Sequence, residues 1–322
     1  MALPRNRDVW GPERAGLDDI EPLNRVFSDA FTERYRRDGM TGVRVPYLHP
    51  AIWRYALEDS AEGAMVWRDG DGGIVGFNIV HRSGAEGWMG PLAVSSDWQG
   101  RGIGRGMLEA GIGWLQDRGA RTIGLETMPR TVDNIGFYSR LGFEPGFMTV
   151  TMIRELAGPV RGAAPPELMA SGSGAVAQVE ECQALLARLA PGSDYSREIV
   201  LSRELALGDV AMVREGGALT GFALWHSAAL AAGRPADEVR VLKVVALDIR
   251  AFTALVGAME SAALRIKLPR VSFRCQSRSL EAWHLLVDRG YRVHWTDLRM
   301  TLRGYPEPAV AEGAVVWSNW EV

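Results

Sequence analysis

The stretch that decides the fold is LAVSSDWQGRGIGRGMLEAGIGWL, which runs from Leu92 to Leu115. It begins as an apolar strand and ends as an amphipathic helix, in which Leu108, Ile112 and Leu115 share one face. Between them lie four glycines on alternate positions, Gly100, Gly102, Gly104 and Gly106. Glycine lets backbone N–H groups converge on an anion, and the helix dipole favours negative charge at that end. The turn therefore predicts a cradle for a pyrophosphate.

Two better-known phosphate-binding loops do not fit this segment. No register of it gives G-x-G-x-x-G, and the lysine of the G-x-x-x-x-G-K-[ST] loop is missing. Composition alone leaves one alternative open, a flexible turn between strand and helix that binds nothing.

The elements around this turn follow from hydrophobic periodicity. Apolar residues with a period near 3.6 predict helices, and alternating or continuous apolar runs between turn residues predict strands. Before the turn we expect helices over 17–39 and 49–59 and strands over 63–68, 73–81 and 88–94. After it we expect a strand over 122–127, a helix to about 141 and a last strand near 147–153.

The second half of the chain repeats this order of elements. A constant shift of 148 positions aligns the two halves through strand, helix and strand. The matched pairs are Gly142-Phe143 with Gly290-Tyr291, Met152 with Met300, and 123–128 with 271–276. A constant offset over several elements indicates an internal duplication.

A stretch rich in Pro, Gly, Ser and Ala, GPVRGAAPPELMASGSG, separates the halves and predicts a linker. We therefore expect a first domain at 1–157, the linker at 158–174, a second domain at 175–304 and a tail at 305–322. The tail contains the apolar run AVVWSNW, a hazard for aggregation if left free. It is expected to add as an edge strand or to pack across the domain boundary.

Composition excludes several classes of protein. Lys and Arg number 36 against 39 Asp and Glu, a net charge of −3, so no overall positive field favours nucleic acid. No run approaches the roughly 20 apolar residues of a membrane span, and the first residues lack a secretory signal, which predicts a cytoplasmic protein. Two cysteines, Cys182 and Cys275, are too few for a disulfide framework or a thiolate zinc site, and we expect buried thiols and no metal.

The run from Gln99 to Gly104 resembles the Q/R-x-x-G-x-G/A loop of the GCN5-related N-acetyltransferases (GNAT). LAV before it is similar to their splayed fourth strand, and IGLETM, NIGFYSRLGF and Gly142-Phe143 resemble the strand, helix and Gly-Phe pair that follow. The resemblance implies an α+β fold of two tandem domains, each a mixed, mostly antiparallel sheet flanked by helices in three layers. It also implies acetyl-CoA as cosubstrate. The backbone contacts that it implies involve Leu92, Ala93 and Val94 along the pantetheine, and Gln99, Gly100, Arg101, Gly102, Ile103 and Gly104 around the pyrophosphate.

One position departs from the family pattern. An asparagine often stands seven residues before the helix tyrosine and contacts the pantetheine, but here that position is Thr131, and Asn134 lies four before Tyr138. Thr131 and Asn134 are the candidates for this contact, and Thr131 could instead cap the helix.

Amide formation requires a group that takes a proton from the amine and one that protonates the leaving thiolate. In the family the helix tyrosine sits beside the sulfur, which makes Tyr138 the candidate acid. Glu126, twelve residues before Tyr138 in the strand IGLETM, is the candidate base, by likeness to the ribosomal-protein alanine N-acetyltransferases. A carboxyl pKa near 4.3 suits this role poorly without burial or a water relay. His81 and solvent are therefore alternative bases.

The second copy lacks the features of a donor site. Where the glycine turn should lie it has Asp248 to Phe252, with bulk, an acidic group and no glycine. Leu286 takes the place of Tyr138, and Arg274 that of Glu126 (126 + 148 = 274). We expect this copy to keep the fold without binding acetyl-CoA.

The resulting hypothesis is an N-acetyltransferase with one active site, in the amino-terminal domain. It would acetylate a primary amine on a small molecule or a peptide terminus, as a monomer or homodimer. Aromatic and polar side chains of the first helical region are candidates for the acceptor site: Tyr35, Tyr47, His49 and Trp53. The alternative is a sensor or docking module that binds acyl-CoA without turnover, and transfer of a longer acyl group or to a hydroxyl also stays open.

Overall fold

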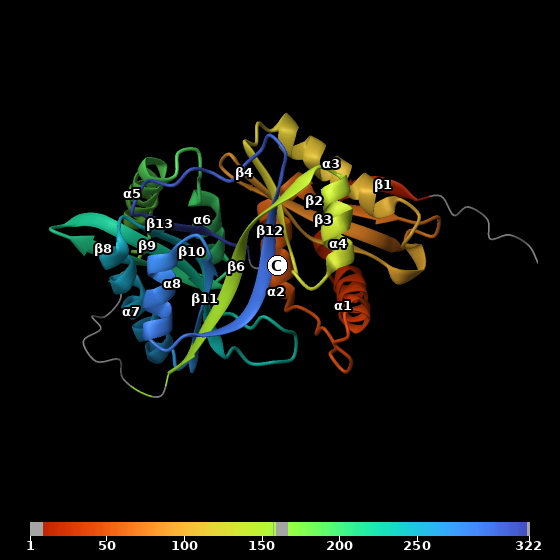
Figure 1. Cartoon of the computed structure of the whole chain (residues 1–322). Coiled ribbons are helices and arrows are strands. Elements are labelled where there is room, and N and C mark those ends of the chain that lie inside the picture. Colours follow the sequence, from red (N-terminus) through yellow and green to blue (C-terminus); the bar gives the residue numbers. More distant parts are fainter. Residues whose placement is uncertain (1–8, 157, 159–166, 321–322) are drawn as a thin grey trace, which may run out of the picture.

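The structure, a computed structural model, describes residues 9–156, 158 and 167–320. One long twisted sheet runs through the molecule, with helices packed on its faces (Figure 1). The predicted α+β fold class is confirmed. Of the predicted linker, residues 159–166 lie outside the described part, and the limits of the two domains stay a prediction.

The first copy follows the predicted order of elements, with an additional first strand that the sequence did not suggest. Local residue types explain where α2 begins. Its first residue is Pro50, whose fixed φ suits a first turn, and His49 Nδ1 accepts the Ala51 N–H at 3.2 Å. Its elements are β1 Trp10–Arg14, α1 Ile20–Arg37, α2 Pro50–Ser60, β2 Ala64–Arg68, β3 Ile74–Ser83, β4 Glu86–Val94, α3 Ile103–Asp117, β5 Thr122–Thr127, α4 Val132–Arg140 and β6 Phe143–Glu155.

The second copy repeats this order and confirms the duplication. Helices α4 and α8 both have nine residues and begin 148 positions apart (280 − 132 = 148). Strands β5 and β11 also begin 148 positions apart (270 − 122 = 148). Its elements are β7 Glu167–Leu168, α5 Ser173–Leu189, α6 Ser196–Glu204, β8 Gly208–Glu215, β9 Ala218–His226, β10 Glu238–Ala246, α7 Ile249–Arg265, β11 Arg270–Gln276, α8 Leu280–Asp288, β12 Arg292–Leu302 and β13 Val315–Ser318.

The two copies exchange their long final strands. In the order of the sheet, β5 is followed by β12, then β6, then β11, so β12 lies within the sheet of the first copy and β6 within that of the second. In Figure 1 these two strands cross the centre of the molecule side by side. All four strands pair antiparallel, with Glu126 opposite Arg299 and Thr151 opposite Arg274. Residues distant in the sequence therefore meet at the centre.

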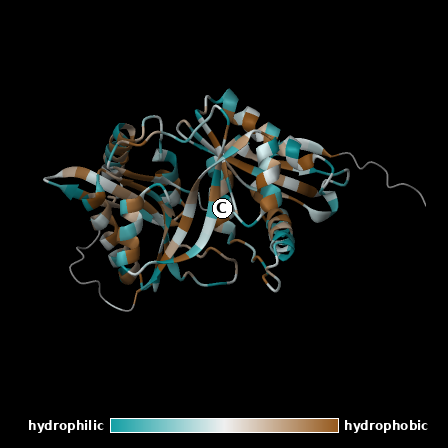
Figure 2. Cartoon of the chain, in the orientation of Figure 1, coloured by the Kyte–Doolittle hydropathy of each residue, from teal (hydrophilic) through white to brown (hydrophobic). Residues whose placement is uncertain are grey.

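Helices cover both faces of the first-copy strands. Phe77 and Ile79 of β3 pack with Trp53 and other residues of α1 and α2, whereas Val80 packs with Leu108 of α3 on the opposite face. Figure 2 shows the corresponding colours, with hydrophobic residues along the strands and the inner faces of the helices. Burial on two faces explains why these strands contain long apolar runs instead of strict alternation.

The tail fills a gap inside the second copy. Strand β10 pairs with β11 only from Glu238 to Val241, and from Lys243 to Ala246 it pairs on that side with β13 instead. Trp317 of β13 is fully buried against Phe252 and Phe273, and its indole N–H donates to Ser279 Oγ at 3.0 Å. The expectation of an edge strand is therefore wrong, because β13 lies inside the sheet. The other expectation, packing across the boundary, is confirmed by Trp320, which stacks on His81 of the first copy.

Composition also led to expectations about the two cysteines and about membrane-spanning helices. Cys182 and Cys275 are both buried free thiols, as predicted, and burial raises each pKa to about 12. No helix in the described ranges is long and apolar enough to cross a bilayer.

Replacement of Trp317 by alanine should lower the free energy of unfolding by about 3 to 5 kcal/mol, because it opens a cavity in the core of the second copy. Denaturant unfolding followed by circular dichroism measures this change. Val176→Ala, at a side chain that is 63% exposed, is the control and should change the free energy by less than about 0.5 kcal/mol. A loss as small for Trp317→Ala would mean that the tail does not occupy the gap in solution.

Candidate active site

The glycine turn opens directly onto the start of α3. Gly100 and Gly102 have φ of +77° and +82°, a region that residues with a side chain rarely adopt, and Gly102 is the residue before the first helical position. A Cβ at either position would meet no neighbouring atom within 4 Å, so the backbone faces open space. The N–H groups of Ile103 and Gly104 belong to the first turn of α3, where no carbonyl of the helix can accept from them. The turn thus has the geometry of an anion cradle.

The side chains of Gln99 and Arg101 hold the turn in place. Gln99 donates to the Val94 carbonyl at 2.9 Å, and Arg101 donates to the Asp97 carbonyl at 2.9 Å. The Arg101 guanidinium also lies 4.9 Å from the centre of the Trp98 ring. Both side chains bond within the loop, which leaves its backbone to face outward.

A gap opens beside the predicted donor strand. β4 pairs with β5 in parallel only from Glu86 to Met89, while Leu92 to Val94 pair with β3 alone among the described strands. Apart from the Val94 carbonyl, which accepts from Gln99, their polar groups on the β5 side are therefore available to an extended ligand. This agrees with the splayed fourth strand expected from the sequence.

The equivalent gap in the second copy is occupied. β13 pairs with Lys243–Ala246, and Asp248 Oδ1 accepts the Ala251 N–H at 2.8 Å in the first turn of α7. Backbone and carboxylate thus take up the positions that a pantetheine and a pyrophosphate would need. The open gap of the first copy fits an acyl-CoA, and the filled one does not.

Helix α4 carries the other predicted donor-side residues. Tyr138 is buried against Phe137 and Phe143, and burial raises its pKa to about 12, so the phenol keeps its proton at neutral pH. Thr131 stands at the N-cap position of α4, but its hydroxyl donates to Asp38 at 2.6 Å and makes no capping hydrogen bond. Asn134 is half-buried in the first turn of the helix.

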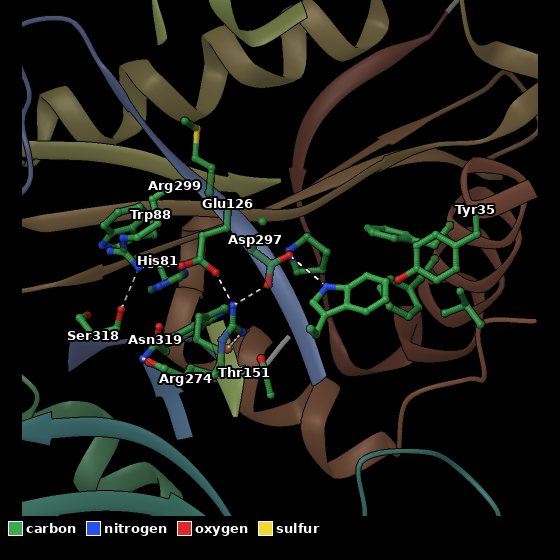
Figure 3. Close-up of a pocket in the computed structure, with 18 residues that line it drawn as sticks. Tyr35, His81, Trp88, Glu126, Thr151, Arg274, Asp297, Arg299, Ser318 and Asn319 are labelled. Carbon is green, nitrogen blue, oxygen red and sulfur yellow. Dashed lines mark hydrogen bonds and ion pairs between the residues drawn. The ribbon is translucent and has the colours of Figure 1, made fainter. Parts of the chain in front are cut away.

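A cavity of about 360 Å³ lies where the exchanged strands meet the first copy (Figure 3). Both copies and the tail contribute to it. Its lining residues are Phe27, Phe31, Tyr35, Val45, His81, Trp88, Met89, Gly90, Pro91, Glu126, Thr151, Arg274, Trp295, Asp297, Arg299, Ser318, Asn319 and Trp320.

The structure brings only some of the predicted site residues to this cavity. Tyr138 is not among those that line it, and of the four candidates from the first helical region only Tyr35 is. Trp53 is in the core, where its indole N–H donates to Asn24 at 2.7 Å, while His49 caps α2 and Tyr47 is 38% exposed.

Glu126, the predicted base, is held by three donors. Its Oε1 accepts from Thr149 Oγ1 and from Arg299, both at 2.6 Å, and its Oε2 accepts from Arg274. Burial alone would raise the pKa of Glu126, but the two guanidinium groups and the hydroxyl hold it below the usual value. Its role as base stays a prediction, and these contacts weaken it as a proton acceptor.

Asp297 of β12 is a second carboxylate in the same cavity. It accepts the Trp295 indole N–H at 3.2 Å and lies 3.3 Å from Arg274. Burial raises its pKa to about 6, with Glu126 adding to the rise and Arg274 opposing it. Sequence analysis missed Asp297. The 148-residue offset aligns it with Thr149 of the first copy (297 − 148 = 149), which gives no sign of a carboxylate in the site.

His81, the alternative base, is buried and lies flat against Trp320, with ring centres 3.3 Å apart. Burial, together with the nearby Lys243 ammonium, holds its pKa well below the usual value, so the imidazole is neutral at pH 7. Its Nδ1 has no hydrogen-bond partner among the described residues. Nor do they contain a cluster of His, Cys, Asp or Glu that could hold a metal ion.

Comparison with known proteins finds a family match within the first half of the chain. Residues 23–143 match the model of the acetyltransferase (GNAT) family. N-alpha-acetyltransferase 30 of Schizosaccharomyces pombe is 31% identical over 96 residues, which are 29% of this chain and 64% of that protein. Mycothiol acetyltransferase of Propionibacterium freudenreichii subsp. shermanii is 30% identical over 156 residues, 44% of this chain and 48% of that protein. The chain thus spans between about half and just under two thirds of these relatives.

A solved structure has the same arrangement of both halves. The tandem GNAT protein from the clavulanic acid biosynthesis pathway superposes with a TM-score of 0.59, covering 93% of this chain and 100% of that one. The sequences are 14% identical, so this likeness concerns the fold alone.

Proposed function

Because residues 23–143 form a GNAT-family domain and the whole chain has a tandem GNAT fold, we propose that it moves an acetyl group from acetyl-CoA to a primary amine. The observation that carries this proposal is the glycine turn beside the open gap at Leu92–Val94. Its counterpart in the second copy is filled by β13, which supports one active site per chain.

On the donor side, backbone groups do most of the binding. The N–H groups from Gly100 to Gly104 would hold the pyrophosphate at the start of α3, where the helix dipole adds favourable charge. The open side of Leu92–Val94 would accept the pantetheine as a strand accepts a neighbour. Asn134 is the remaining candidate for a side-chain contact, because the Thr131 hydroxyl already bonds to Asp38.

The reaction joins the amine nitrogen to the acetyl carbon and breaks the carbon–sulfur bond. The acceptor arrives as an ammonium ion and must lose one proton before its lone pair can attack. The electron pair of the broken bond leaves on sulfur, which takes a proton from Tyr138. The second proton of the nitrogen then restores the phenol, so the overall products are an acetamide, the free thiol and one proton.

The cavity between the copies would take the acceptor. It adjoins Met89, Gly90 and Pro91, which directly precede Leu92–Val94 in β4, so the amine would approach from the side of the exchanged strands. An amine on a peptide terminus or on a small molecule fits this description equally. The same geometry without turnover would describe a sensor, and release of free thiol on addition of amines separates the two.

Gly102→Val should weaken acetyl-CoA binding by about tenfold or more, since valine is strained at this φ and its bulk covers the N–H groups. Isothermal titration calorimetry measures the Kd and should give one site for the unmodified chain. Gly113→Val, on an open face of the same helix, is the matched control and should keep the affinity. Failure of the unmodified protein to bind acetyl-CoA would refute the proposed function, and two sites would refute the single-site proposal.

Tyr138→Phe should lower kcat by about 10² or more and leave the Kd for acetyl-CoA unchanged, because the lost proton donor acts only on the departing sulfur. Steady-state thiol release gives kcat, with Tyr47→Phe as the control at an exposed tyrosine. An unchanged kcat would remove Tyr138 as the acid.

Glu126→Gln should lower kcat/KM by about 10², because it takes away a carboxylate close to the reacting atoms and leaves Arg274 and Arg299 without this partner. The control is Glu144→Gln, which removes an exposed ion pair with Arg303. If the Glu126 variant works at full rate, the carboxylate is not needed for transfer.

A further inference from the structure

We propose that Asp297, which β12 carries from the second copy into the cavity, binds the ammonium group of the acceptor and accepts its proton. The acceptor is then a primary amine on an aromatic or apolar body, with no anionic group beside the nitrogen. This inference rests on the function proposed above and assigns the acceptor side of the same site.

The position of Asp297 within the cavity is the first argument. The cavity is lined by Met89 to Pro91 of β4, which directly precede Leu92–Val94, and by aromatic residues of α1. Figure 3 shows Asp297 between Glu126 and Arg274 on one side and Tyr35 on the other. The Trp295 ring contacts both Asp297 and Tyr35. An amine whose body lies against Tyr35 and Trp295 can therefore place its nitrogen at this carboxylate.

The second argument is the free capacity of its oxygens. A carboxylate can accept about four hydrogen bonds. Asp297 has one contact of 3.2 Å from Trp295 and one of 3.3 Å from Arg274, both long for bonds to a charged group. Glu126, in contrast, accepts from two arginines and a threonine. Of these two carboxylates, Asp297 is the one with room for an ammonium ion.

The aromatic residues around Tyr35 suit the rest of such a molecule. The Tyr35 and Trp295 rings lie 5.9 Å apart and are tilted by 45°, and Phe27, Phe31 and Val45 continue the surface. Aromatic faces attract cations and bury apolar groups, so they favour an organic amine over a hydrated ion.

Charge pairing excludes an anionic substituent near the nitrogen. Both arginines of the cavity already have carboxylate partners: Arg274 pairs with Glu126 and Asp297, and Arg299 pairs with Glu126 and Glu307. A carboxylate or phosphate on the acceptor would have to displace one of these partners. An amino acid with a free α-carboxylate is therefore a poor acceptor.

The proton balance also favours Asp297. It would take one proton from the ammonium ion before the nitrogen attacks, and it would return that proton to solvent after the product leaves. Its raised pKa, about 6, makes it a stronger base than Glu126 and keeps it ionised at neutral pH. The groups that face it are Arg274 of β11, Glu126 of β5, Tyr35 of α1 and the uncharged threonines of β6.

The sign of the pH dependence follows from these groups. Activity requires the carboxylate form, so kcat/KM should fall as pH drops through about 6. If Glu126 were the base, its pKa, which the two arginines lower, would place this fall below the usual range of a glutamate.

The test uses the full chain with acetyl-CoA and 2-phenylethylamine, and L-phenylalanine serves as the matched acceptor that adds a carboxylate. We expect thiol release with the amine and at least about tenfold lower kcat/KM with the amino acid. Asp297→Asn keeps the acceptor oxygen for Trp295 and should lower kcat/KM by about 10² at pH 7.5. It should also remove the fall near pH 6 and leave the Kd for acetyl-CoA unchanged. Glu126→Gln should keep a fall but at lower pH, because the charge of Glu126 contributes to the raised pKa of Asp297.

Two further variants keep the test decisive. Asp288→Asn, at an exposed aspartate that ends α8, should behave as the unmodified protein. Should Asp297→Asn fail to fold by circular dichroism, Asp297→Glu replaces it, and this variant should keep the fall in the pH profile at reduced kcat/KM.

The outcomes separate the two proposals. Any of three results would overturn this inference and leave acetyl transfer intact. They are full activity of Asp297→Asn with an unchanged pH profile, loss of the fall in the pH profile of Asp297→Glu, and equal use of the amine and the amino acid. Turnover of other amines but not of 2-phenylethylamine would overturn the acceptor class. No turnover of any amine by the unmodified chain would overturn the proposed function itself.

Discussion

The exchange of β6 and β12 is the constraint on which the rest of the molecule depends. Each strand pairs with a strand of the other copy along most of its length, so neither copy has a complete sheet by itself. The exchange places Arg299 opposite Glu126 in the ladder and Arg274 opposite Thr151, and these cross-strand neighbours build the charged floor of the cavity. The catalytic centre that we propose is therefore a product of duplication as much as of the first domain.

The two gaps beside the fourth strands show how duplication can separate tasks. In the second copy the gap between β10 and β11 is closed by β13, whose backbone bonds to the residues that a ligand would otherwise use. Trp317 then packs where that gap meets the start of α8. In the first copy no described strand closes the gap, and the glycine turn lies beside it. The gap beside the fourth strand is thus open in one copy and filled by the chain itself in the other.

Sequence analysis could predict what depends on local pattern. The glycine turn, the order of elements and the 148-residue offset all follow from residue types within short windows, and α4 and α8 match that offset at both ends. It could not predict Asp297, because an aspartate in the strand WTDLRM has meaning only once β12 is known to lie beside β5. The hydrogen-bond donors of Glu126 could not be predicted for the same reason, since two of the three come from the second copy.

The position of the tail has a consequence for how the protein is made. A ribosome releases β5 and Glu126 long before it reaches β12, and Trp320 comes later still. Until those residues emerge, the nascent first half exposes an unpaired strand edge and an unfinished pocket. Unpaired strand edges can pair with other chains and lead to aggregation. The polypeptide is therefore most exposed to aggregation, and most in need of a chaperone, while residues 127 to 292 are being synthesised. Synthesis of the last described residues both closes the second copy and completes the pocket of the first.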